Sequence, residues 1–196
     1  VNLKSLVPRG HSLDGLVDVQ YVRFPPSQEE EQLQRLARPY DPDTRLGTPL
    51  QMATYRHWDY RPETPDSRNP LARARSLDDL QAFPFPDLST PYYIDGLARQ
   101  VRALHQQGMA AGGNLPHLGG ELFEAAWRLR GLENFLLDLV ERHDWADYLL
   151  DQLTALARRN AEALAFAGVD VLALDDDVGM PGTMFISPKI WRRFFK

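Results

Sequence analysis

Three consecutive carboxylates, Asp175, Asp176 and Asp177, follow directly after a short apolar run at 169–174. The run contains β-branched residues and begins after Gly168, a pattern typical of a buried parallel strand. α/β enzymes place their catalytic groups at the carboxyl ends of such strands. Helix capping or simple solvation is the structural alternative, but adjacent carboxylates repel one another and a turn needs only one of them. We therefore predict that all three are catalytic, with either the outer two or Asp176 alone facing the site.

A second group of polar side chains follows another predicted strand, at 109–115. His117 comes directly after this strand, and Glu121 and Glu124 lie in the helix expected at 119–131. An imidazole at a strand end can bind a metal or transfer protons, whereas a histidine elsewhere is more often a surface or capping residue. We predict that these three residues bind substrate.

The composition is that of an ordinary globular protein and argues against several functional classes. The 196 residues are 43% hydrophobic and 25% charged, and the formal net charge is −5, with no basic stripe that would bind nucleic acid. No apolar run is long enough to span or target a membrane, so we expect a cytoplasmic protein. The sequence has no cysteine, which excludes disulfides, thiolate nucleophiles and Cys-based zinc sites within these residues. We predict no metal site and no cofactor within them.

Hydrophobic periodicity predicts alternating strands and helices. We expect strands at 16–24, 109–115 and 169–174, helices at 29–38, 94–108, 119–131, 132–140 and 145–167, a capped turn at 76–80, and a helix that begins at Ser187-Pro188. Such alternation indicates a parallel sheet with right-handed crossovers. An α/β barrel and an open doubly wound sheet both fit. No glycine-rich nucleotide-binding motif follows a strand.

Residues 39–91 are rich in proline and poor in periodicity, which is typical of a functional loop or lid. An aromatic and polar cluster at 55–60 either lines a ligand pocket or pins the loop by burial. Residues 6–10, LVPRG, resemble a protease-cleavage linker, so whether residues 1–12 are native stays open. The chain ends within an expected helix, and we interpret it as a fragment.

Two sequence blocks resemble the uroporphyrinogen decarboxylase superfamily. The first has the form A-G-x-D-x-[apolar]-x-x-D-D-x-G followed by S-P, and the second has the form G-x-L-F-E-x-A-x-x-L-R-G. The matching residues are Ala167, Gly168, Asp170, Asp176, Asp177, Gly179, Ser187 and Pro188 in the first, and Gly120, Leu122, Phe123, Glu124, Ala126, Leu129, Arg130 and Gly131 in the second. The resemblance extends from about residue 70 to the end.

The resemblance implies a (β/α)₈ TIM barrel, which needs about 250 residues. Residues 1–196 would then form a single incomplete barrel domain, roughly its N-terminal half. The superfamily includes decarboxylases of uroporphyrinogen, which are lyases of porphyrin (haem) biosynthesis. It also includes methyltransferases that move a methyl group between a corrinoid protein and a thiol, using zinc held by His and Cys.

Departures from the decarboxylase pattern favour the methyltransferase branch. The arginine-rich R-Q-A-G-R-Y segment that grips substrate carboxylates is absent, Trp127 stands where the decarboxylases carry tyrosine, and Asp176 stands in place of their serine. A carboxylate there repels a poly-carboxylate substrate. We therefore predict a corrinoid-linked methyltransferase-like enzyme that binds a tetrapyrrole or corrinoid partner. It would use zinc held outside this fragment. We also predict that Trp127, Met184 and Ser187 contact substrate.

Two other functions stay open. The first is true uroporphyrinogen decarboxylation, with basic groups supplied by residues outside this chain. The second is a barrel that binds a tetrapyrrole or small ligand without turnover.

Overall fold

A computed structural model describes residues 19–25, 69–83, 85, 88–115 and 120–196 of the chain. These residues form a mixed α/β structure with a small parallel sheet and six helices. The helix expected at 29–38, the aromatic cluster at 55–60 and His117 lie outside the described residues. In the described part, no helix is long and apolar enough to cross a membrane.

The sheet is parallel, with the strand order β1-β2-β3. β1 (Val19–Val22), β2 (Ala110–Asn114) and β3 (Val171–Ala173) correspond to the three predicted strands. Val22 pairs with Gly113, which pairs with Leu172. Strands that are consecutive in the sequence are therefore neighbours in the sheet, with all carboxyl ends at one edge.

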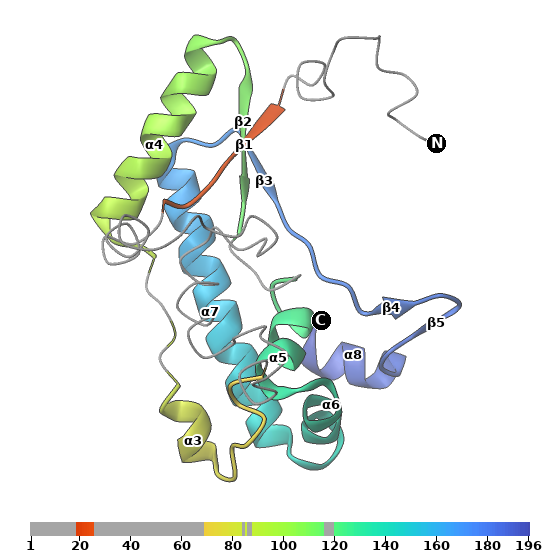
Figure 1. Cartoon of the computed structure of the whole chain (residues 1–196). Coiled ribbons are helices and arrows are strands. Elements are labelled where there is room, and N and C mark those ends of the chain that lie inside the picture. The colour runs from red at the N-terminus through yellow and green to blue at the C-terminus, as the bar shows by residue number, and fades with distance from the viewer. Residues whose placement is uncertain (1–18, 26–68, 84, 86–87, 116–119) are drawn as a thin grey trace, which may run out of the picture.

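Two helices cover one face of this sheet (Figure 1). They are α4 (Pro91–Gln106) and α7 (His143–Ala167), which ends at Gly168 in the left-handed conformation. Gly113 leaves room for α7, because a Cβ at this position would lie 2.9 Å from a methyl group of Leu164. One buried cluster joins both helices to the sheet: Val22, Phe24, Leu88, Tyr93, Leu97, Val101, Ala111, Leu115, Leu156, Ala163, Leu164 and Ala167.

The described residues leave the opposite face of the sheet largely uncovered. Tyr21, Gly112 and Val171 are in register and share this face, and the Tyr21 ring lies over Gly112, within 2.8 Å of a Cβ placed there. Tyr21 is 51% exposed and Val171 is 43% exposed. Leu172, on the helix-covered face, is also 41% exposed. The prediction that the run at 169–174 is a buried strand was therefore wrong, because β3 has no neighbour on its outer edge among the described residues.

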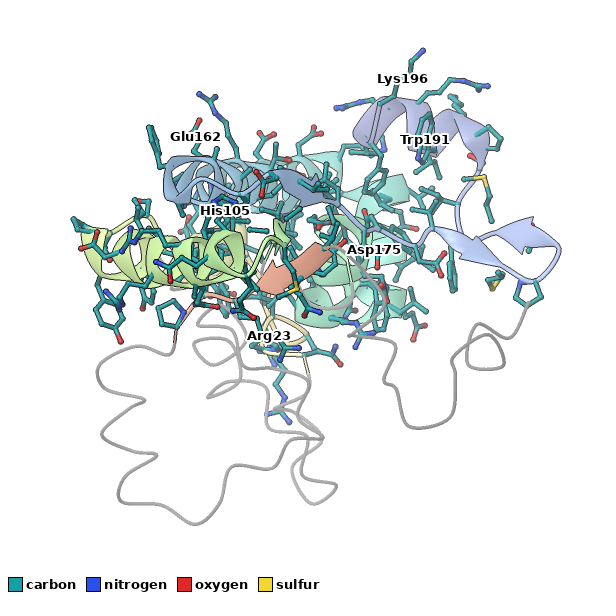
Figure 2. The ribbon with its side chains drawn as sticks, turned by 90° about the horizontal axis from the view of Figure 1, so that it is seen from above. Arg23, His105, Glu162, Asp175, Trp191 and Lys196 are labelled. Atoms are coloured by element: carbon teal, nitrogen blue, oxygen red, sulfur yellow. The ribbon has the colours of Figure 1, made fainter. Side chains whose placement is uncertain are left out.

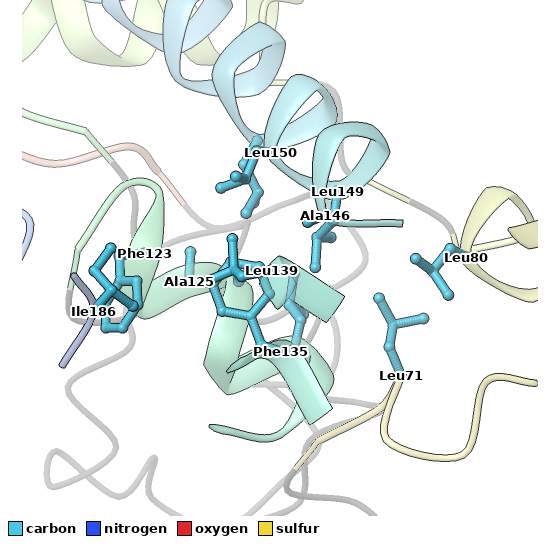
Figure 3. Close-up of a cluster of buried hydrophobic side chains, with 13 residues drawn as sticks. Leu71, Leu80, Phe123, Ala125, Phe135, Leu139, Ala146, Leu149, Leu150 and Ile186 are labelled. Atoms are coloured by element: carbon cyan, nitrogen blue, oxygen red, sulfur yellow. The ribbon is translucent and has the colours of Figure 1, made fainter. Parts of the chain in front are cut away.

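A second apolar cluster packs beyond the carboxyl ends of the strands (Figure 3). It joins α3 (Leu77–Gln81), α5 (Phe123–Arg130) and α6 (Leu132–Glu141) to the N-terminal half of α7. Ser76 and Asp79 form the capping box that starts α3, which confirms the predicted capped turn. The cluster consists of Leu71, Leu80, Phe123, Ala125, Ala126, Leu129, Phe135, Leu139, Ala146, Leu149, Leu150, Leu153 and Ile186.

The chain after β3 forms a short antiparallel hairpin and a last helix. The hairpin consists of β4 (Gly179–Met180) and β5 (Thr183–Met184), joined at Pro181-Gly182, where Gly182 has φ +84°. The sequence predicted only a loop here. α8 (Pro188–Phe194) begins as predicted, because the Ser187 hydroxyl accepts the backbone N–H of Ile190 at 3.3 Å.

Asp170 links the amino-terminal end of the sheet to α4. Its carboxylate accepts the backbone N–H of Ala111 at 2.8 Å and contacts His105 Nε2 at 2.8 Å. The Ala111 bond, and then the His105 bond, hold the pKa of Asp170 below its ordinary value of 3.8. Ionised Asp170 therefore favours the folded state, and this contribution is lost as the pH falls through its lowered pKa.

We expect the Asp170→Asn variant to be less stable than the native protein near pH 6. The asparagine side chain can still accept the Ala111 N–H, but it lacks the negative charge of Asp170. The difference in the free energy of unfolding should shrink as Asp170 protonates. Urea unfolding at pH 6 and below pH 3 measures this difference. A difference independent of pH would show that the charge of Asp170 does not stabilise the fold.

Candidate functional site: a carboxylate junction at the strand ends

The carboxyl end of β3 is joined to the segment that precedes α5 by a reciprocal pair of hydrogen bonds. The backbone N–H of Glu121 donates to the carbonyl oxygen of Asp175 at 3.0 Å. The backbone N–H of Asp175 donates to Glu121 Oε2 at 2.8 Å. Two acidic residues that are 54 positions apart in the sequence are thereby held together where strands β2 and β3 end.

Asp176 caps α5 from a distant segment. Its Oδ2 accepts the backbone N–H of Phe123 at 2.8 Å, and its Oδ1 accepts that of Glu124 at 3.1 Å. Leu122 occupies the N-cap position of α5 and has no side chain that can accept a hydrogen bond. The carboxylate therefore satisfies two N–H groups that the helix itself leaves open, and it complements the positive end of the helix dipole.

Gly120 allows this close contact. A Cβ at this position would lie 2.8 Å from the Cα of Asp176 and would also overlap Oδ1 of the same side chain. Any larger residue at 120 would therefore push the end of β3 away from α5.

Glu121 has an unusual environment for a carboxyl group. Its Oε2 is bonded to Asp175, but its Oε1 is buried and has no hydrogen-bond partner in the described part of the chain. Burial raises the pKa of Glu121 from 4.5 to about 7, and the negative charges of Asp176 and Asp175 act in the same direction. Hydrogen bonds from the backbone of Asp175 and of Glu121 itself oppose the shift. A carboxyl group with this pKa can donate or accept a proton near neutral pH.

The three predicted catalytic aspartates have three different environments. Asp176 caps α5, as described above. Asp177 closes its own turn, because its Oδ1 accepts the backbone N–H of Gly179 at 2.8 Å. Asp175 is exposed where the chain leaves the sheet (Figure 2), and its carboxylate makes no hydrogen bond to any other described residue. Among the three, Asp175 is the one whose two carboxylate oxygens have no hydrogen-bond partner in the described part of the chain.

The predicted substrate-binding residues on α5 form a local group. Arg128 donates to Glu124 Oε1 at 3.1 Å, and its guanidinium lies 4.8 Å from the centre of the Trp127 ring. The backbone N–H of Glu124 is held by Asp176, so this group lies beside the Glu121–Asp175 pair.

The remaining predicted site residues lie elsewhere or have other contacts. Met184 is 39% exposed in the hairpin, which projects away from the sheet in Figure 1. The hydroxyl of Ser187 is used as the cap of α8. Within the described ranges, no group of three His, Cys, Asp or Glu side chains could hold a metal ion.

Sequence reasoning missed the pairing of Glu121 with Asp175, and it gave helix capping only as an alternative for one of the three aspartates, without assigning that role to Asp176. A signal for the capping role was present. α5 begins after Leu122, without Ser, Thr, Asp or Asn at its N-cap, so its N–H groups need an acceptor from another segment.

Comparison with known proteins identified no matching family model, no similar curated protein and no similar solved structure.

Proposed function

We propose that this chain is part of a (β/α)₈ barrel enzyme of the uroporphyrinogen decarboxylase superfamily and that its activity is corrinoid-linked methyl transfer. The observation that carries the proposal is the position of Glu121. It is a carboxyl group with a pKa of about 7, held beside Asp175 at the carboxyl edge of a parallel sheet. This edge is where barrel enzymes carry their chemistry.

The one-sided packing of the sheet supports a barrel over a doubly wound sheet. α4 and α7 contact the same face and share one core, and the opposite face carries Tyr21 and Val171. In a barrel all helices lie outside the strands and the other face is filled by strand side chains, whereas a doubly wound sheet has helices on both faces. The order β1-β2-β3 is that of consecutive barrel strands.

Glu121 can act as the proton acceptor for a thiol substrate. Near pH 7 about half of the Glu121 side chains are ionised, because its pKa is about 7. The carboxylate would take the thiol proton as sulfur forms its bond to the methyl group. The carbon–cobalt bond of the methylated corrinoid would break in the same step, and its electron pair would stay on the corrinoid. The bond from Asp175 N–H to Oε2 fixes the orientation of the carboxylate and leaves Oε1 without a hydrogen-bond partner among the described residues. General base catalysis of this kind contributes about 10²- to 10⁴-fold in rate.

The charge of the junction fits a corrinoid better than uroporphyrinogen. A corrinoid supplies the methyl group, and its rim carries neutral amides that donate hydrogen bonds to carboxylates such as Asp175. Uroporphyrinogen carries many carboxylates, which the charges of Asp175, Asp176 and Asp177 would repel. Because the described residues do not contain a zinc-binding group, the proposal assigns no step to zinc.

The experiment is a methyl-transfer assay on the full gene product that contains this chain. The protein is mixed with methylcobalamin and a small thiol, and the methyl thioether is measured by mass spectrometry. We expect product formation, with a rate about 100-fold lower in Glu121→Gln. The matched control is Glu133→Gln, an exposed glutamate on α6, which should keep the native rate.

Three results would contradict the proposal. Release of carbon dioxide from uroporphyrinogen without methyl transfer would make the protein a decarboxylase. Binding of methylcobalamin with no turnover would make it a binding protein. Methyl transfer that survives in Glu121→Gln would remove Glu121 from the reaction.

A further inference from the structure

We propose that Asp176 is a positioning residue: its carboxylate caps α5 from the end of β3 and thereby holds Glu121 against Asp175. This inference rests on the proposed function only in taking Glu121 as the carboxyl group that accepts the substrate proton. It differs from the prediction that Asp176 itself is catalytic.

Both carboxylate oxygens of Asp176 are already engaged. Oδ2 accepts the N–H of Phe123, and Oδ1 accepts that of Glu124. A side chain that binds two backbone amides of a helix start is poorly placed to bind substrate as well, because breaking either bond leaves a helix N–H without an acceptor. Its effect on a reaction would therefore pass through the groups that it holds.

Glu121 lies in the sequence between two places where the segment before α5 contacts Asp176. On its N-terminal side, Gly120 packs against the Cα of Asp176, and on its C-terminal side, Phe123 and Glu124 are bonded to the Asp176 carboxylate. Glu121 itself makes both hydrogen bonds to Asp175. The segment 120–124 is thus fastened to residues 175–176 at four points, and Asp176 supplies two of the acceptors.

Two variants of Asp176 distinguish the effect of losing the helix cap from the effect of losing the negative charge. Asp176→Ala removes both acceptors. Asp176→Asn keeps one oxygen acceptor in the same place and removes the negative charge near Glu121. Asp177→Asn is the matched control. It removes a neighbouring charge, and among the described residues the Asp177 carboxylate bonds only within its own turn, to Gly179.

The measurements are amide hydrogen exchange at Phe123, Glu124 and Asp175, and the titration of the Glu121 carboxyl carbon by NMR. In Asp176→Ala we expect exchange to rise about tenfold at all three amides, in line with the loss of a helix cap. In Asp176→Asn the Asp175 amide should stay protected, while the Glu121 midpoint falls below its native value. Asp177→Asn should leave exchange at all three amides unchanged and shift the Glu121 midpoint less than Asp176→Asn does.

A cap with only local structural importance would give a different result. Exchange in Asp176→Ala would then rise at Phe123 and Glu124 alone, with exchange at Asp175 unchanged, and the inference would be overturned. Unchanged exchange at all three amides in Asp176→Ala would overturn it as well. If Asp176→Ala does not fold, Asp176→Ser decides, because one hydroxyl oxygen on a shorter side chain cannot replace both acceptors. Unchanged exchange at the Asp175 amide in that variant rejects the inference.

The methyl-transfer assay distinguishes this inference from the proposed function. If the native protein transfers methyl groups, the acidic limb of its pH–rate profile should move in Asp176→Asn together with the Glu121 midpoint. If the native protein transfers none but the exchange and titration results are as expected, the positioning role stands and the methyltransferase proposal fails.

Discussion

Replacing Arg130 by methionine is expected to lower the free energy of unfolding by about 3–5 kcal/mol. Arg130 is 1% exposed, and its Nε donates to Asp138 Oδ2 at 2.7 Å. Asp138 is also 1% exposed. The variant would leave a buried carboxylate without its main partner, which is far more costly than removing both charges together.

The same guanidinium also holds the segment before α3. Its Nη1 donates to the carbonyl oxygens of Leu71 and Ala72 at 2.7 and 3.1 Å, and its plane lies 5.0 Å from the centre of the Trp145 ring. Loss of Arg130 should therefore weaken the attachment of residues 71–72 to α5, which the bond from Leu71 N–H to the Leu129 carbonyl oxygen still maintains.

Urea unfolding followed by tryptophan fluorescence measures the effect. The matched control is Arg142→Met, because Arg142 contacts the other oxygen of Asp138 at 3.6 Å but is half exposed. We expect that control to cost under about 1 kcal/mol. The double variant Arg130→Met with Asp138→Leu should recover part of the loss. Equal losses for Arg130→Met and Arg142→Met would show that burial of this ion pair is not what stabilises it.

Glu121→Gln is expected to make the protein more stable at pH 8 while it lowers the rate of the proposed methyl transfer. Folding raises the pKa of Glu121 from 4.5 to about 7, so the folded state favours the protonated form. The contribution of this group to stability is therefore fully present below pH 4.5 and is lost as the pH rises to about 7. Glutamine resembles the protonated acid and keeps an oxygen that accepts Asp175 N–H.

The stability difference between Glu121→Gln and the native protein should grow between pH 4.5 and about 7 and stay constant above. Because Glu121 is partly exposed, we expect a difference of about 1 kcal/mol at pH 8. Urea unfolding at pH 4 and pH 8 measures it, and Glu133→Gln should show no such difference. A native protein that is more stable than Glu121→Gln at pH 8 would mean that ionised Glu121 is favoured by the fold.

The sequence predicted the regular elements well because their signals are local. α7 was expected at 145–167 and is found at His143–Ala167, since apolar residues recur along one face and Gly168 ends the helix. β2 was expected at 109–115 and is found at Ala110–Asn114. Ser187-Pro188 starts α8 through a side-chain bond within three residues.

The contacts that build the site could not be predicted, because they join residues more than fifty positions apart. An apolar run gives the same pattern for a central strand and for an edge strand, so the exposure of β3 was missed. Helix capping was the structural alternative for one of the three aspartates, but the sequence did not indicate which aspartate caps a helix, which helix it caps, or that Asp177 closes a turn. The sequence likewise suggested a barrel only by resemblance, and the strands of the described residues do not close into one.

The packing of α7 has a consequence for how the protein unfolds. The first half of α7, up to Leu153, packs in the cluster that contains Phe123 and Phe135. The second half, from Leu156, packs in the cluster between the helices and the sheet. α7 has 25 residues and is about 37 Å long, so this single helix contributes side chains to both apolar clusters. Neither core can melt without exposing half of this helix. Unfolding should therefore be a single cooperative event, with amide protection nearly uniform along α7 instead of falling into two steps.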